Sequence, residues 1–237
     1  MYIRLKNIIQ DCCAEMPNVI FSYVKKTRKK NMFIYELFFE GFKNIESVLT
    51  NIDIVAYSQA GAILRNTIEQ FSILKVLIDH PEIVRTYNKF AKLRVQKAKN
   101  HPEAETKIEE LYNNRKTKNC RKVFYLDFGW LEELDVKELK IESVLKLANF
   151  EDLIPWRDLC NNYVHNDVSF TQYHKETLNY YIESFIYICA FLFDHMVCMF
   201  HNMTGFDFYI NGIDYSIVYL ELYKRVREHR EQRYKHT

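Results

Sequence analysis

The stretch from Thr171 to about Met203 constrains the fold of this chain most, because its helical pattern is apolar on nearly every face in its middle. A helix without a polar face must be covered by other elements, so it should lie at the centre of a helix bundle. Its longest run without a charged residue, Ser184 to Phe193, has ten residues, fewer than a membrane span needs. We therefore predict a buried central helix and no membrane partner.

The rest of the chain also favours helices. Only 5 Gly and 4 Pro occur among 237 residues, which leaves few turns and indicates long helices. Pro17 is predicted to open one that runs to about Val48. Because no internal repeat or low-complexity linker is visible, we predict an all-α multi-helix bundle, a single domain over residues 1–237 with its core at about 30–203.

The C-terminal part, residues 204–237, has a different pattern. Apolar and polar residues alternate over Phe206–Ile210 and Ile213–Ser216, on either side of Asn211-Gly212. Asn-Gly favours a two-residue hairpin turn, so the sequence predicts a small β-hairpin, followed by a basic helix to about Tyr234.

Two positions one turn apart on a predicted helix could line a polar cavity. Arg65 and Glu69 are four residues apart and share a helix face with the small residue Gly61. The alternative is a surface salt bridge, worth a few tenths of a kcal/mol.

The segment from Pro155 to Asp167 is the strongest candidate for chemistry. It combines Arg157, Asn161, Asn162 and His165 on about three helical turns. Arginine carries a permanent planar charge and histidine titrates near neutral pH, so together they can bind an anion and act on it. The alternative is that His165 caps the C-terminus of a helix.

Charge, cysteine and histidine content bear on the possible ligands and on the location of the protein. The net charge is +2, so any nucleic-acid role rests on local patches, such as the helix that carries Lys89 and Lys92 as candidate substrate-binding residues. The six cysteines have no regular spacing, which favours a reducing, cytoplasmic location. His195 and His201 are six apart and no HExxH motif occurs, so we predict no metal ligand and no cofactor.

Several of these motifs occur together in one family. The Arg65-x-x-x-Glu69 helix, Trp130, and the segment Trp156 to His165 with Leu159-Cys160 resemble an uncharacterised prokaryotic all-helical domain family over about residues 30–200. That family carries a Leu-Ser…His signature. The resemblance implies an all-helical fold and a shared polar site made by Arg65, Glu69 and His165, without an established activity.

More distantly, Arg157…His165 resembles the motif of HEPN domains, which are helical ribonucleases of prokaryotic defence and toxin systems. Their motif is Arg, four to six residues, then His, whereas seven residues intervene here. The resemblance implies a homodimer that cleaves RNA without a metal, with His165 and Arg157 as catalytic residues and Glu69 and Arg65 orienting the site. The competing hypothesis is a binding or adaptor module in which the same residues only hold helices together.

Overall fold

The computed structural model describes residues 1–27, 32–164, 175–205 and 215–234, and in these ranges every regular element is a helix. The predicted all-α class is therefore confirmed. The predicted hairpin is not among the described elements: residues 206–214 lie outside them, and Tyr215 and Ser216 already belong to a helix. Contacts divide the chain into two compact units. Unit 1 is Met1–Phe71 with Pro155–Thr237, and unit 2 is Ser72–Ile154.

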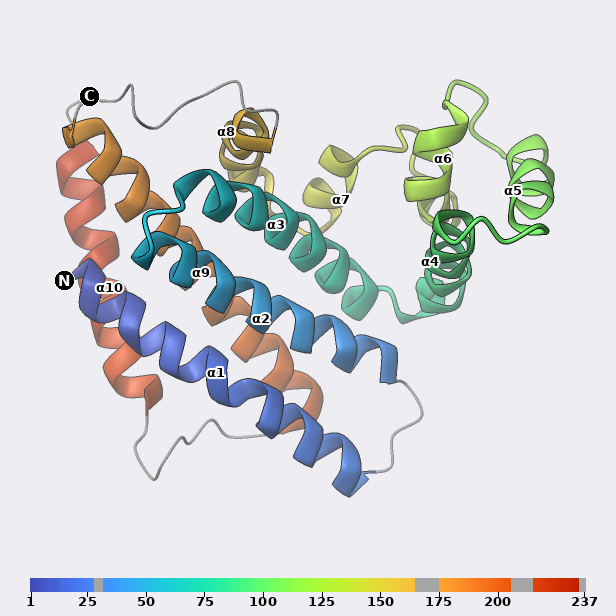
Figure 1. Ribbon diagram of the computed structural model, residues 1–237. Coiled ribbons are helices and arrows are strands. Elements are labelled where there is room, and N and C mark those ends of the chain that lie inside the picture. Colours follow the sequence, from blue (N-terminus) through green and yellow to red (C-terminus); the bar gives the residue numbers. More distant parts are fainter. Residues whose placement is uncertain (28–31, 165–174, 206–214, 235–237) are drawn as a thin grey trace. The chain divides into compact units, whose positions relative to one another are not determined.

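Unit 1 is built from long helices (Figure 1). Helix α9 contacts α1, α2 and α10, and α1 also contacts α2 and α10. Their bounds are α1 (Tyr2–Thr27), α2 (Met32–Asp53), α3 (Tyr57–Asp79), α8 (Ile154–Val164), α9 (Lys175–Thr204) and α10 (Tyr215–Tyr234); the C-terminal part of α3 lies in unit 2.

Helix α9 supplies much of the buried core of unit 1, as its all-round apolar pattern predicts. Phe185 and Phe193 are almost fully buried, and Phe193 packs edge to face on Phe42 of α2. By length and composition alone Leu178–Thr204 could cross a membrane, although 56% of its most apolar window is buried within the structure. The absence of a membrane partner stays a prediction.

Helix α1 corrects one prediction. Pro17 lies inside this helix instead of opening one. Buried residues recur through α1 at three- and four-residue intervals, among them Leu5, Ile9, Cys13 and Met16. Burying this stripe outweighs the cost of about 3 kcal/mol of an interior proline. Buried side chains thus extend beyond the range 30–203 in which we predicted the core.

The helices that lie wholly in unit 2 have 3 to 15 residues. They are η1 (Pro81–Ile83), α4 (Val84–Ala98), α5 (Ala104–Asn113), α6 (Lys122–Phe128), η2 (Gly129–Leu134), α7 (Ile141–Leu147) and η3 (Glu151–Leu153). Leu93, Ile108 and Leu126 form a cluster where α4, α5 and α6 meet. The division into two units reflects only which helices contact one another. That residues 1–237 form a single domain therefore stays a prediction.

Candidate functional site

Two helices of unit 1 bring three of the predicted site residues together. Arg65 and Glu69 lie one turn apart on α3, and Arg157 lies on the first turns of α8. Arg157 Nε donates a hydrogen bond to Glu69 Oε1 at 2.9 Å. Arg65 Nε lies 3.2 Å from the same oxygen. One carboxylate oxygen therefore receives two guanidinium groups, and we call these three residues the Arg–Glu–Arg cluster.

The cluster is half-buried. The side chains of Arg65 and Glu69 are 24% and 22% exposed, and that of Arg157 is 12% exposed. A pair of this kind is shielded from salt more than a surface pair, and its side chains remain partly exposed to water. Arg65 Nε is buried and, within the described part of the chain, its contact with Glu69 does not have hydrogen-bond geometry.

Two further groups lie near the cluster. Arg157 Nη1 donates to Asp158 Oδ1 at 3.0 Å, so the residue next to Arg157 in the chain also contacts its guanidinium. Cys160 is fully buried, and burial raises the pKa of its thiol to about 12 although the charge of Arg65 lowers it. This thiol stays protonated at neutral pH, so Cys160 is not a nucleophile there.

The structure does not show the other predicted site residues as part of the Arg–Glu–Arg cluster. Asn161 is on α8 and half-buried, and Asn162 is on α8 without a described side chain. His165 lies outside the described residues, directly after the last residue of α8. Lys89 and Lys92 are exposed on α4, in unit 2. Among the described residues, no group of three or more His, Cys, Asp or Glu side chains is placed to hold a metal ion.

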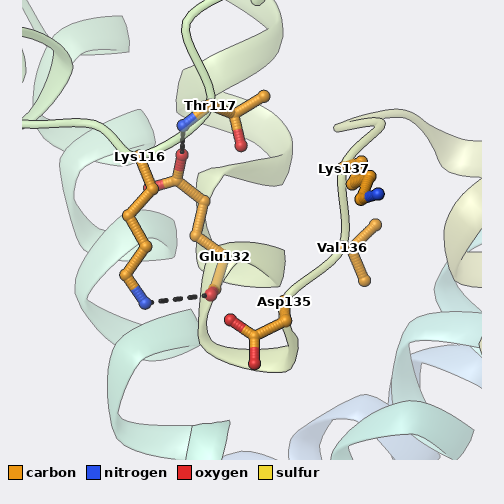
Figure 2. Close-up of a pocket in the computed structure, with 6 residues that line it drawn as sticks. All are labelled: Lys116, Thr117, Glu132, Asp135, Val136 and Lys137. Atoms are coloured by element: carbon orange, nitrogen blue, oxygen red, sulfur yellow. Dashed lines mark hydrogen bonds between the residues drawn. The ribbon is translucent and has the colours of Figure 1, made fainter.

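Unit 2 contains a pocket of about 240 Å³ (Figure 2). Of the residues that line this pocket, Glu132 is the only charged one that is buried. The backbone N–H of Thr117 donates to Glu132 Oε1 at 2.6 Å, and the hydroxyl of Tyr125 donates to Glu132 Oε2 at 3.3 Å. Lys116 Nζ lies 3.4 Å from its backbone carbonyl. Burial, and then the charge of Glu132, raises the pKa of Tyr125 above its usual value. Glu132 thus fastens the 114–121 loop to η2, which is a structural role.

Comparison with known proteins gives one match. Residues 31–181, which include the whole Arg–Glu–Arg cluster, match DUF5677, a family of unknown function. No curated protein and no solved structure matches the chain. The sequence resemblance to an uncharacterised helical family is thereby supported, whereas the comparisons do not show the link to HEPN domains.

Proposed function

The chain belongs to the DUF5677 family of unknown function, and we propose that it is a metal-independent endoribonuclease of a defence or toxin type. The observation that carries the proposal is the convergence of Arg65 and Arg157 on Glu69. Two arginines held by one carboxylate are pre-organised for a phosphate, because guanidinium groups match the geometry of its oxygens and their orientation is fixed before the ligand arrives.

In the proposed reaction His165 accepts the proton of a ribose 2′-hydroxyl. The 2′-oxygen attacks the adjacent phosphorus, and the bond to the 5′-oxygen of the next nucleotide breaks. The leaving oxygen takes up a proton, so the products are a 2′,3′-cyclic phosphate and a 5′-hydroxyl. Arg157 stabilises the negative charge that develops on the phosphorane oxygens, while Glu69 with Arg65 orients the site. Following the HEPN resemblance, we propose that a homodimer is active.

The geometry also favours a second candidate, a binding or adaptor module in which the cluster is structural. Glu69 neutralises Arg157 by a direct hydrogen bond and thereby ties α3 to α8, which lie far apart in the sequence. In this case the ion pair contributes to stability and to the specificity of helix packing, and no RNA is cleaved.

Cleavage of RNA by the purified full chain distinguishes the two candidates. We expect wild-type protein to release products with a 2′,3′-cyclic phosphate in the presence of EDTA, and His165→Ala to abolish this with little change in thermal stability. His101→Ala is the matched control, because His101 is an exposed histidine in unit 2. Two results together would establish the structural module instead. Folded wild-type protein would leave RNA intact, and His165→Ala would lower the free energy of unfolding by about 1–3 kcal/mol.

A further inference from the structure

Helix α4 is strongly basic. Between Val84 and Asn100 the chain has six basic residues and no acidic residue. Two of them are used inside unit 2. Arg94 Nη1 donates to the backbone carbonyls of Leu126 and Asp127 at 3.1 and 3.2 Å. Lys97 Nζ lies 3.9 Å from a carboxylate oxygen of Glu105.

The other four cations lie on the opposite side of the helix, the last of them, Lys99, at its C-cap position. They follow one another at intervals of four, three and seven residues, and all four are exposed: Arg85, Lys89, Lys92 and Lys99. At 100° per residue these positions occupy an arc of about 80°, and they extend over about 21 Å along the helix. Among the described residues, none of the four forms an ion pair. We call this surface the α4 basic face.

The opposite face of α4 explains why these cations point outward. Tyr87, Phe90 and Leu93 are buried, and Tyr87 and Phe90 pack on Trp130 and Tyr125. Tyr87, Phe90 and Leu93 are therefore covered within unit 2, and a single Val, Val95, is the large apolar side chain that α4 leaves exposed, at 53%. An amphipathic helix that binds a lipid surface needs its apolar face for the bilayer, so α4 does not fit that class of partner.

We propose that the α4 basic face binds the sugar–phosphate backbone of RNA. A row of exposed cations without intervening acids is complementary to a polymer that repeats a negative charge along its length. No aromatic residue lies between these cations on the exposed face, so base stacking is not part of the contact. The contact positions the chain on RNA without reading its sequence.

This inference rests on the proposed ribonuclease function only for the choice of RNA as the polyanion. The binding surface is in unit 2, whereas the Arg–Glu–Arg cluster is in unit 1. Binding and cleavage are therefore tested with different ligands and different variants. An oligoribonucleotide with 2′-O-methyl groups cannot be cleaved through its 2′-oxygen, and it reports binding alone.

The experiment measures fluorescence anisotropy of a labelled 2′-O-methyl oligoribonucleotide with the full chain over a range of salt concentrations. Four phosphate contacts predict a slope of about −2.8 for log K against log salt. Lys89→Gln/Lys92→Gln should halve this slope to about −1.4 and weaken binding at least about tenfold at low salt. Lys140→Gln/Lys146→Gln is the control of equal charge, because both lysines are exposed in unit 2 but lie outside α4.

Three results would overturn the proposal: no binding by wild-type protein, an equal loss in the control variant, or displacement of the RNA by polyglutamate at equal charge concentration. The last result would identify an acidic protein as the partner. Binding without cleavage of unmodified RNA would retain the α4 basic face and reject the ribonuclease. Cleavage of unmodified RNA by wild-type protein that does not bind the 2′-O-methyl oligoribonucleotide would reject the α4 basic face and retain the ribonuclease.

Discussion

Arg157 donates from its Nε to Glu69 Oε1 at 2.9 Å across a separation of 88 residues in the chain. This contact joins α8 to α3 within unit 1, and Arg65 approaches the same oxygen. Because the Arg157 side chain is only 12% exposed, its charge is largely removed from water and depends on Glu69 for compensation.

Removing either partner of this contact should therefore destabilise the protein. We expect Glu69→Gln and Arg157→Gln each to lower the free energy of unfolding by about 1–3 kcal/mol. The double variant should show a coupling energy of about 0.5–3 kcal/mol, measured by denaturant unfolding in a double-mutant cycle. Asp158→Asn serves as the control, because the side chain of Asp158 is 55% exposed and a surface pair contributes at most about 1 kcal/mol. Strict additivity of the two substitutions would contradict a direct interaction.

The central helix provides a second prediction. We expect Phe185→Ala and Phe193→Ala each to lower the free energy of unfolding by about 3–5 kcal/mol. Both rings are almost fully buried, so each substitution leaves a cavity in the core. Phe39→Ala on α2 is the matched control, since Phe39 is 38% exposed. Denaturant midpoints of the two α9 variants equal to that of the wild type would contradict the placement of α9 in the core.

Stability should depend on pH through Asp53. Partial burial raises the pKa of Asp53, but the hydrogen bonds from Lys6 and Gln10 outweigh this effect and hold the pKa below its usual value. The stabilisation is therefore complete above the unfolded pKa near 3.9 and is lost as the pH falls through the lower, folded pKa.

The test compares Asp53→Asn with the wild type by thermal unfolding. At pH 7 the variant should be less stable by about 0.5–1 kcal/mol, a small effect because the Asp53 side chain is 45% exposed. This difference should shrink as the pH falls below about 4. A difference that stays constant down to pH 2 would show that the charge of Asp53 does not contribute.

Gly129 is required by its neighbours. A Cβ at this position would lie 2.7 Å from Cε1 of Phe90 and 3.0 Å from Cε2 of Tyr125, in a pair of rings that already pack edge to face. Gly129→Ala should lower the free energy of unfolding by about 1–3 kcal/mol through overpacking. Phe90→Leu should lower the free energy of unfolding less in the Gly129→Ala variant than in the wild type, because the smaller side chain makes room for the new Cβ. Denaturant unfolding of the four proteins measures this difference.

Local signals in the sequence predicted two helix ends correctly. Helix α9 ends at Thr204, one residue after the predicted end at about Met203, and α10 ends at Tyr234 as predicted. Proline positions and helix periodicity act over a few residues, so a single sequence shows them directly. Pro17 lies inside α1 and not at a helix start, because burial of the apolar stripe of α1 outweighs the local preference of proline for the first turn.

The cluster shows where local signals end. The four-residue spacing of Arg65 and Glu69 places them on one face of a helix, and the structure pairs them. The contact between Glu69 and Arg157 depends on how α3 and α8 pack, and no local pattern encodes a contact between residues that far apart. The sequence alone therefore does not show whether the Arg65–Glu69 pair and the Arg157…His165 motif share one site.

Unit 1 is discontinuous in the chain, since it is interrupted by residues 72–154. Its folding must bring Glu69 and Arg157 together, and closing a flexible loop of 88 residues costs about 4 kcal/mol of chain entropy. If residues 72–154 are already compact, most of that freedom has been lost before the loop closes. We therefore expect the folding rate of unit 1 to depend on the stability of the inserted segment, through chain connectivity alone.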